Sequence, residues 1–335
     1  MPASLACAAV EDGGARFQSF SGLAERQAGR YGDKPFLTWY DDGRGERVEL
    51  SFKTFDNWVG KVANLLVEEL GVEHGDRVAA VLVDHWQAAV VLAACWRAGA
   101  GVVVVDPDAT PAARAAAVGG VAAAFVREEW VAEVGRDHPG AGLVALTADL
   151  LGRSEHDLGA ALRFARVVPS MPDHFLADPG DPPAEAFTVA AGSPPAPAGG
   201  VGEAAGEGMT MAGLLAEAAR LVARTGLGDR DRLRCGLGLL RPAGVAAGLL
   251  APFGTGAGVV LAREFQPARF WKRVADERVT VAVLDPAQAE ALLAAGPPPA
   301  DLDRSRLRTV ACQPAGVAEQ LRAGWEQRLG VPLAR

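Results

Sequence analysis

Short runs of consecutive apolar residues alternate with longer segments of helical periodicity, and this alternation constrains the fold more than any other feature. Val78 to Val83 and Val102 to Val105 are continuous apolar runs, as expected of strands that are buried on both faces of a sheet. Two weaker runs follow, near Val121 to Val126 and near Leu143 to Thr147. Strands that alternate with helices in this way form a parallel sheet covered by helices. We therefore predict an α/β fold.

Candidate helices flank the first of these runs. Ser51 or Thr54 can serve as the N-cap of a helix whose apolar residues recur at helical spacing, and Gly71 ends that pattern. Asp84 can cap a second helix, which we expect to run to Arg97.

The second half of the chain repeats the plan of the first. Thr210 can cap a helix that ends at Gly226. Two segments near the apolar runs at Val78 and Val102 also have similar segments later in the chain. The matched segments are Gly75–Val78 with Arg230–Leu233, and Gly99–Val103 with Gly256–Val260. This echo predicts two layered α/β subdomains.

The boundaries between these units follow from composition. Residues 179–209 are rich in Pro, Gly, Ala and acidic side chains, which is typical of a loop or linker. Within them, Glu185 to Ala190 can form a strand. We expect an N-terminal α/β subdomain at 1–178, the Pro/Gly-rich strand and loop at 179–209, and a second, truncated α/β subdomain at 210–335.

Composition and charge exclude several classes of protein. The 335 residues carry a net charge of -8 and contain no cluster of Lys and Arg, whereas a protein that binds nucleic acid needs a basic surface. The longest apolar stretches, such as Ala88 to Cys95 and Ala243 to Leu250, are too short to span a bilayer. Met1 to Val10 lacks the basic region of a signal peptide. We expect a cytoplasmic protein that binds neither nucleic acid nor membrane.

Motifs for other common chemistries do not occur in the sequence. The 4 cysteines are widely scattered, which argues against a zinc site and against a disulfide framework, and Cys95 is most simply a small core residue. No G-x-S-x-G elbow and no HExxH pairing is present. We interpret the 5 histidines as surface or helix-capping residues. We assign no catalytic residue and no metal ligand.

Several short segments occur in an order and spacing typical of a known family. They are Leu50–Phe52, Gly75–Val78, Arg97–Ala100, Val105–Pro107, Phe265–Pro267, Asp276–Thr280, Asp285–Pro286, Leu307–Val310 and Leu329–Leu333. In these segments the chain resembles the N-terminal domain of the adenylate-forming superfamily, which includes acyl-CoA synthetases, nonribosomal-peptide adenylation domains and luciferases. In particular, it looks like a group of short relatives of acyl-CoA synthetases found in high-GC bacteria.

The resemblance implies a phosphate-binding loop between the two subdomains. Working members of the superfamily use ATP to convert a carboxylic acid into an acyl-adenylate, which is then transferred to a thiol such as coenzyme A. Their loop directs backbone N–H groups, hydroxyls and a Lys at the phosphates. The resemblance places this loop at Ala191 to Gly200 and implies ATP or AMP as the ligand of Gly192, Ser193, Gly199 and Gly200.

The loop in this chain lacks most of the groups that would hold a phosphate. Pro194 and Pro195 have no N–H to donate, and their fixed φ opposes folding around an anion. Ala198 stands at the position of the Lys, and Ser193 alone keeps a hydroxyl. We therefore interpret the loop as vestigial.

Other parts of the family's site differ as well. Leu239 to Pro242 stands where the family has an aromatic–His pair. Within it, Arg241 could meet an anionic substrate or could simply be solvated. Gln313 to Ala315 stands in place of a Gly-Gly-Ala turn that contacts adenine. The sequence ends at Arg335, before the remaining adenine and ribose contacts, so we expect no C-terminal domain with its catalytic Lys.

Two functions are compatible with this pattern. The first is a non-catalytic or severely impaired homologue, a pseudoenzyme that binds a nucleotide, an acyl group or a partner protein. The second is a divergent adenylate-forming enzyme that a separate chain completes. The retained scaffold and the lost loop favour the first.

Overall fold

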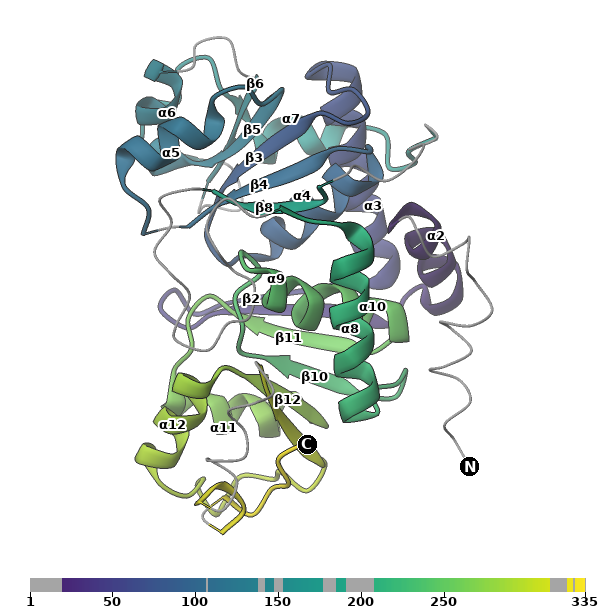
Figure 1. Ribbon diagram of the computed structural model, residues 1–335, viewed down its shortest axis with the longest axis vertical. Coiled ribbons are helices and arrows are strands. Elements are labelled where there is room, and N and C mark those ends of the chain that lie inside the picture. Colours follow the sequence, from purple (N-terminus) through teal and green to yellow (C-terminus); the bar gives the residue numbers. More distant parts are fainter. Residues whose placement is uncertain are drawn as a thin grey trace.

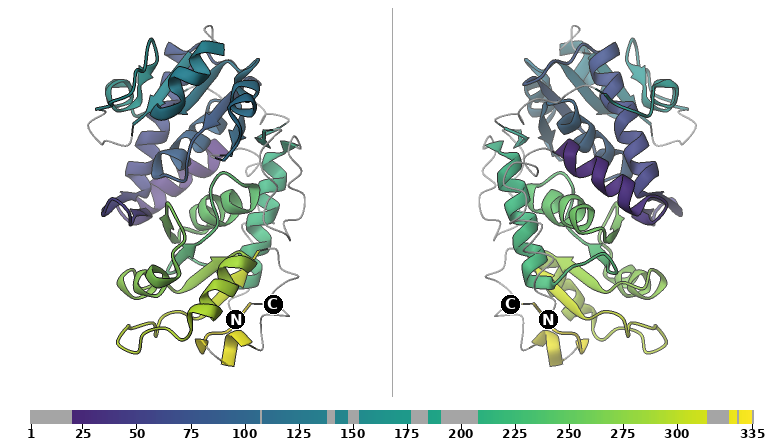
Figure 2. Two further views of the ribbon diagram at one scale, coloured as in Figure 1. Left: turned by 90° about the vertical axis from the view of Figure 1, so that its left-hand side faces the viewer. Right: turned by 90° about the vertical axis from the view of Figure 1, so that its right-hand side faces the viewer.

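The computed structural model describes residues 20–106, 108–137, 142–147, 153–176, 185–190, 208–313, 324–327 and 329–334. Within them the chain forms two β-sheets, with helices between the sheets and on their outer faces (Figure 1). The two sheets follow one another along the long axis of the molecule, as the side views in Figure 2 also show. This arrangement confirms the predicted α/β fold with two layered units. None of the described helices has the length and apolar character that a membrane span requires.

The first sheet has seven strands in the order β7-β6-β5-β3-β4-β8-β9. They are β3 (Arg77–Val81), β4 (Gly101–Val105), β5 (Ala123–Arg127), β6 (Gly142–Leu146), β7 (Leu162–Arg163), β8 (Phe187–Val189) and β9 (Gly208–Met209). Neighbouring strands are parallel except β8 and β9, which are antiparallel. The apolar runs of the sequence form β3 to β6, and the strand expected before residue 191 is β8. These strand predictions are confirmed.

The second sheet has six strands in the order β13-β12-β10-β11-β1-β2. They are β1 (Pro35–Asp41), β2 (Glu46–Ser51), β10 (Arg232–Cys235), β11 (Gly258–Ala262), β12 (Val281–Leu284) and β13 (Thr309–Cys312). Strand β1 pairs in parallel with β11, with Leu37 opposite Val259, and β2 runs antiparallel to β1. Sequence patterns predicted neither β1 nor β2. These two N-terminal strands belong to the same sheet as β10 to β13 from the C-terminal part of the chain. The domain boundaries at 178 and 210 stay a prediction.

Helices cover both faces of each sheet. The inner layer, which lies between the sheets, contains α2 (Phe20–Tyr31), α3 (Phe52–Asn64) with its extension η1 (Leu65–Glu69), α4 (Trp86–Arg97), α8 (Met211–Thr225), and the consecutive α9 (Pro242–Val245), η4 (Ala246–Leu250) and α10 (Ala251–Thr255). The outer helices are α5 (Pro111–Val118) and α6 (Val131–Asp137) on the first sheet, and α11 (Pro267–Asp276) and α12 (Pro286–Ala295) on the second. Three short helical turns complete the described elements: η2 (Glu128–Trp130), α7 (Phe164–Val167) and η3 (Val168–Ser170).

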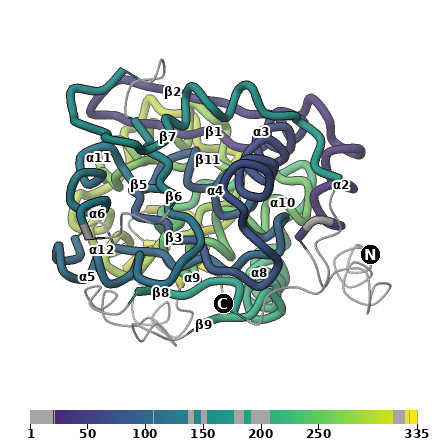
Figure 3. The backbone as a smooth tube through the Cα atoms, turned by 90° about the horizontal axis from the view of Figure 1, so that it is seen from above, coloured from purple at the N-terminus to yellow at the C-terminus, as the bar shows by residue number. Residues whose placement is uncertain are grey.

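Alternate residues of the strands face different cores, because successive side chains of a strand point to opposite faces of the sheet. In β3, Val78 and Ala80 belong to the inner core that both sheets share, whereas Ala79 and Val81 belong to the outer core beneath α5 and α6. Seen from above, β5 and β6 lie between α6 on one side and α4 on the other (Figure 3). Cys95 of α4 is fully buried in the inner core, as its apolar surroundings in the sequence predicted. Burial on both faces explains why these strands are continuous apolar runs.

Two of the predicted helix starts are observed. At the start of α3, Ser51 Oγ accepts a hydrogen bond from the Thr54 N–H (3.1 Å). At the start of α8, Thr210 Oγ1 accepts one from the Gly213 N–H (3.1 Å). Helix α8 ends at Gly226, whose φ of 62° is the left-handed conformation that glycine adopts most easily. These side chains satisfy N–H groups that have no partner within the helix.

The predicted cap of α4 at Asp84 is wrong. The helix begins one residue later, where His85 Nδ1 accepts a hydrogen bond from the Gln87 N–H (3.2 Å). Asp84 instead accepts a hydrogen bond from the backbone N–H of Leu239, 155 residues away (2.7 Å). A partner from the other sheet therefore outcompetes the local capping role.

The turn that leads from β10 into α9 contains a very close backbone approach. Gly244 in α9 packs against the carbonyl oxygen of Gly238, and a Cβ at Gly244 would overlap that oxygen. Because the obstructing atom belongs to the backbone, no side-chain rotation can relieve the clash. Glycine at position 244 is therefore needed to hold residues 236–241 against α9.

We expect Gly244→Ala to lower the free energy of unfolding by about 1–3 kcal/mol or more, the usual penalty for forcing an atom into packed structure. Gly254→Ala in α10 is the matched control, because a Cβ there meets nothing within 4 Å. The control should be neutral or raise stability by up to about 1 kcal/mol. Urea unfolding followed by circular dichroism measures both, and equal stability of the two variants would contradict the close approach.

Candidate functional site

The carboxyl ends of strands from both sheets meet at one place in the molecule. The segment that follows β10 contacts the segments that follow β3 and β4, through hydrogen bonds from Leu239 to Asp84 and from Arg241 to Asp106. In open α/β sheets, ligands bind outside the carboxyl ends of the strands. We therefore take Asp84, Asp106, Leu239 and Arg241, called the edge cluster below, as the candidate functional site.

Asp84 is a partly buried carboxyl group in the edge cluster. Its Oδ1 accepts the hydrogen bond from Leu239, and a Cβ on Gly238 would lie 2.5 Å from its Oδ2. Glycine at 238 thus lets the backbone approach the carboxyl group. The pKa of Asp84 is raised to about 6, mainly because desolvation disfavours the charged form; the charge of Asp106 also raises it, and the Leu239 N–H and Arg241 lower it. Asp84 is therefore largely ionised at pH 7 but close to titration.

Arg241 and Asp106 form an ion pair across the junction of the two sheets. Arg241 directly precedes α9, and its Nη2 donates to Asp106 Oδ2 at the end of β4. The two side chains are only 20% and 12% exposed. The alternative that Arg241 is simply solvated is therefore wrong. A role for Arg241 toward an anionic substrate stays a prediction.

Two other arginines at the carboxyl ends are also paired. Arg127, the last residue of β5, lies 3.2 Å from Glu129, and Arg263, which follows β11, lies 3.0 Å from Asp41. Within the described residues, each of these arginines and Arg241 faces a carboxylate of the same chain. A triphosphate requires cations directed at its oxygens. The positive charges of Arg127, Arg241 and Arg263 are therefore already paired and are not free to bind a nucleotide.

His85 lies beside the edge cluster as a structural group. Its Nδ1 accepts the capping hydrogen bond of α4, and its ring packs edge-on against Trp39 at a centroid distance of 4.2 Å. The pKa of His85 is lowered to about 3, mainly by desolvation and in addition by the charges of Arg127 and Arg263. The imidazole is therefore neutral at physiological pH, which fits a capping histidine.

The proposed phosphate loop begins at this same edge. Ala190, the residue after β8, donates its N–H to the Val104 carbonyl oxygen (2.8 Å), one residue before the end of β4. Gly192, Ser193, Gly199 and Gly200 lie outside the described residues. The structure therefore neither places these four candidates nor tests their role.

Sequence patterns missed the importance of Asp84, which we interpreted as a helix cap, and of Asp106. Each Asp closely follows an apolar strand, and this position was the available signal. Parallel strands bring their carboxyl ends to one edge, so acidic residues placed there can meet. The sequence does not show that Leu239 and Arg241 are the partners of these two Asp residues, because both follow a strand of the other sheet.

The comparisons with known proteins agree with the fold. A family model described as AMP-binding enzyme matches residues 24–173 and 202–335. A benzoate CoA ligase from Burkholderia xenovorans LB400 superposes with a TM-score of 0.70 at 18% identity, over 94% of this chain and 60% of the ligase. An anthranilate CoA ligase in complex with anthranoyl-AMP superposes with a TM-score of 0.75 at 19% identity, over 95% of this chain and 58% of that one. At such identities the two structures establish the fold alone.

A protein from Mycobacterium tuberculosis (strain ATCC 25618 / H37Rv) is similar over a shorter segment. It is 47% identical over 75 residues, which are 22% of this chain and 31% of that protein. The chain thus spans less than two thirds of each of these relatives. The family match itself leaves residues 174–201 unmatched, and these include the whole segment that the resemblance assigned to the phosphate loop.

We expect Asp84→Asn to stabilise the protein in a pH-dependent manner. Asn keeps an acceptor for the Leu239 N–H but carries no charge, whereas the folded-state pKa of Asp84 is raised from 3.8 to about 6. A raised carboxyl pKa means that the folded state loses stability as pH rises from about 4 through about 6. The stability difference between Asp84→Asn and wild type should therefore grow by up to about 3 kcal/mol between pH 4 and pH 8. Urea unfolding across this range measures it.

Asp303→Asn is the matched control for this experiment. Asp303 is fully exposed, and hydrogen bonds from Ser305 lower the pKa of its carboxyl group. Its replacement should give no gain of stability at any pH. A stability difference for Asp84→Asn that does not change with pH would show that Asp84 titrates as an ordinary exposed carboxyl group.

Proposed function

The chain belongs to the AMP-binding enzyme family, and from this premise we propose that it is an acyl-CoA ligase-like protein whose adenylate-forming activity is lost or severely impaired. It would retain the binding of a nucleotide, an acyl group or a partner protein. The observation that carries this proposal is the pairing of Arg127, Arg241 and Arg263 with carboxylates at the carboxyl ends of the strands. Activation of a carboxylate by ATP requires preorganised positive charge around the phosphates.

The edge cluster would oppose a phosphate in two ways. Asp84 and Asp106 place two carboxyl groups beside the single guanidinium of Arg241. A phosphate that approached Arg241 would have to displace Asp106 from it. It would also meet the charge of Asp84, which is mostly ionised above pH 6. Each effect weakens the binding of a polyanion.

The sequence of residues 191–200 supports the same proposal. Pro194 and Pro195 supply no N–H, and Ala198 supplies no cation. Removal of one preorganised donor from a hydrolase oxyanion hole costs about 3–4 kcal/mol of transition-state stabilisation. Several such losses together would lower the rate of adenylation by many orders of magnitude.

A divergent adenylate-forming enzyme is the second candidate, and Asp84 favours it. A partly buried carboxyl group with a raised pKa, placed where α/β sheets bind ligands, is typical of functional sites. In this alternative a separate chain would supply the groups that complete the site, and Arg241 would exchange Asp106 for a phosphate of ATP.

ATP–pyrophosphate exchange with the purified full chain distinguishes the two candidates. The acids should include benzoate, anthranilate and fatty acids of several lengths. We expect no exchange above the acid-free blank, because the phosphates find no unpaired cation in the edge cluster. Acid-dependent exchange that Arg241→Ala abolishes would refute the proposal and establish the enzyme.

Retained ligand binding has a separate test in the variant Asp106→Asn. Removal of this carboxylate frees Arg241 for a phosphate, so AMP should bind Asp106→Asn about tenfold more tightly than wild type, the value of roughly one charge-assisted hydrogen bond. Thermal shifts at increasing AMP concentration report the affinity. Arg166→Ala on α7 is a control that should leave the AMP shift unchanged. Equal AMP shifts in wild type and Asp106→Asn would show that AMP does not reach Arg241.

A further inference from the structure

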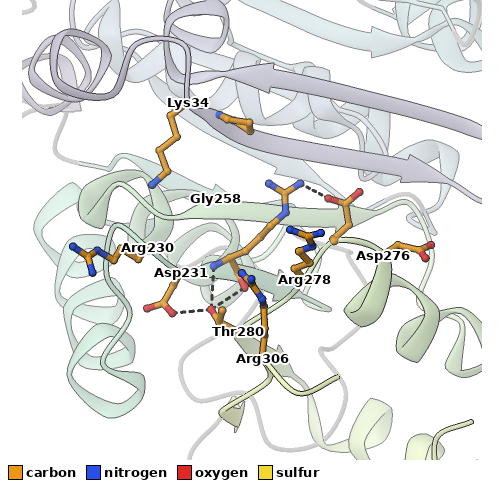
Figure 4. A pocket seen from close by; sticks show the side chains of 11 residues that line it. Lys34, Arg230, Asp231, Gly258, Asp276, Arg278, Thr280 and Arg306 are labelled. Atoms are coloured by element: carbon orange, nitrogen blue, oxygen red, sulfur yellow. Dashed lines mark hydrogen bonds and ion pairs between the residues drawn. The ribbon is translucent and has the colours of Figure 1, made fainter. Parts of the chain in front are cut away.

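A cavity lies on the opposite side of the six-stranded sheet from the edge cluster, at the amino ends of the parallel strands. It has a volume of about 330 Å³ and is lined by Arg232 and Gly258, which begin β10 and β11, and by Thr280, which precedes β12. Figure 4 shows Lys34 and Arg306 reaching toward it from opposite sides. Nucleotide sites of open α/β sheets lie at the other edge, so this cavity is separate from the edge cluster.

Basic side chains outnumber acidic ones around the cavity. Its lining contains the basic residues Lys34, Arg230, Arg232, Arg278 and Arg306. The acidic ones are Asp231, Asp276 and Glu277. This excess of positive charge occurs in a chain whose net charge is -8. The cavity therefore attracts anions, although the protein as a whole repels them.

The three carboxylates are already engaged within the protein. Asp231 lies 2.8 Å from Arg308 and accepts a hydrogen bond from Thr280 Oγ1 (2.7 Å). Glu277 pairs with Arg232. Asp276 pairs on the outer face of α11 with Lys272 (3.0 Å) and Arg273 (3.5 Å). These pairs leave little negative charge to neutralise the remaining arginines of the lining.

Arg230, Arg278 and Arg306 form no side-chain hydrogen bond or ion pair with another residue that the structure describes. All three are exposed. Asp303 is the acidic group whose charge acts on both Arg278 and Arg306, and its carboxylate accepts a hydrogen bond from the Ser305 N–H (3.0 Å). The guanidinium groups of Arg278 and Arg306 and the ammonium group of Lys34 thus line a cavity whose described lining holds no unpaired carboxylate.

The backbone of Arg278 is a second, independent observation. Arg278 follows α11 with a φ of 51°, the only non-glycine residue of the described chain with a positive φ. Its N–H donates to Ala275 (3.1 Å) and the next N–H, of Val279, donates to Val274 (3.0 Å), which is the Schellman arrangement that normally ends in glycine. An arginine at this position is conformationally unfavourable. Glycine would suit this backbone better than arginine, so we look for a role of the Arg278 side chain.

We propose that this cavity binds a small phosphorylated compound, whose phosphoryl oxygens accept hydrogen bonds from Arg278 and Arg306. Guanidinium groups match phosphate geometry with paired donors and stay charged at all physiological pH values. The volume of the cavity suits a small ligand and not a polymer. Lys34 adds a third positive charge from the start of β1, although its Nζ also donates to the Gly256 carbonyl oxygen (2.6 Å). This proposal does not depend on the function proposed for the edge cluster.

Titration calorimetry of the full chain with pyrophosphate, at low salt and without divalent cations, tests the proposal. We expect saturable 1:1 binding that added NaCl weakens. Arg306→Ala and Arg278→Gly should each weaken it about tenfold or more, the loss expected when a charge-assisted hydrogen bond is removed. Arg278→Gly should also unfold at the same or a higher urea concentration, because glycine relieves the left-handed backbone. Weaker binding in this variant therefore cannot result from misfolding.

Two control variants show whether pyrophosphate binds in this cavity or elsewhere on the protein. Arg166→Ala removes one exposed positive charge from α7 on the other sheet and should bind pyrophosphate like wild type. Arg241→Ala should also bind like wild type, and weakened binding in that variant alone would place pyrophosphate in the edge cluster and overturn the proposal. Inorganic phosphate in place of pyrophosphate shows whether one phosphoryl group suffices. Absence of pyrophosphate binding, or binding that Arg278→Gly and Arg306→Ala leave unchanged, would also overturn it.

Discussion

Both sheets bury one face against the same layer of helices, and the rest of the structure depends on this shared core. Three rings from distant segments meet in it: Phe36 of β1, Phe52 at the start of α3, and Phe253 of α10. Phe253 lies with its ring centroid 4.9 Å from Phe36 and 5.5 Å from Phe52. Because β1 belongs to the second sheet while α3 packs against α4 of the first, the N-terminal segment joins the two units. Separation of the sheets would expose these rings to water.

The shared core also determines where the edge cluster forms. Each sheet is largely parallel, so its loops at the carboxyl ends lie on one edge, and the common helix layer brings the two edges into contact. Close contact then requires residues that let backbone and carboxyl group approach, which explains Gly238 beside Asp84 and Gly244 beside Gly238. The apolar residues of the shared core determine how the two sheets pack. This packing brings Asp84 to Leu239 and Arg241 to Asp106.

Elements were predictable from the sequence where their burial was uniform. Strands β3 to β6 have both faces covered and are read directly as apolar runs. Strand β2 lies at the edge of its sheet, and its charged residues alternate with partly buried ones, so the segment from Glu46 to Ser51 has no apolar run to detect. Strand β1 is buried, but its Thr38 and Asp41 interrupt the apolar pattern, and their partners Glu49 and Arg263 are known only from the structure.

The candidate sites were less predictable than the fold, because charge pairing between distant segments decides their chemistry. The six-stranded sheet shows this at the carboxyl and amino ends of its parallel strands. At the carboxyl edge Arg241 and Arg263 face carboxylates, whereas at the amino edge Arg278 and Arg306 make no such pair among the described residues. All four side chains carry the same charge, and the core that holds them is the same. A scaffold can therefore keep its family fold while the edge that offers positive charge to a ligand changes, since the apolar residues that stabilise the fold are not those that bind.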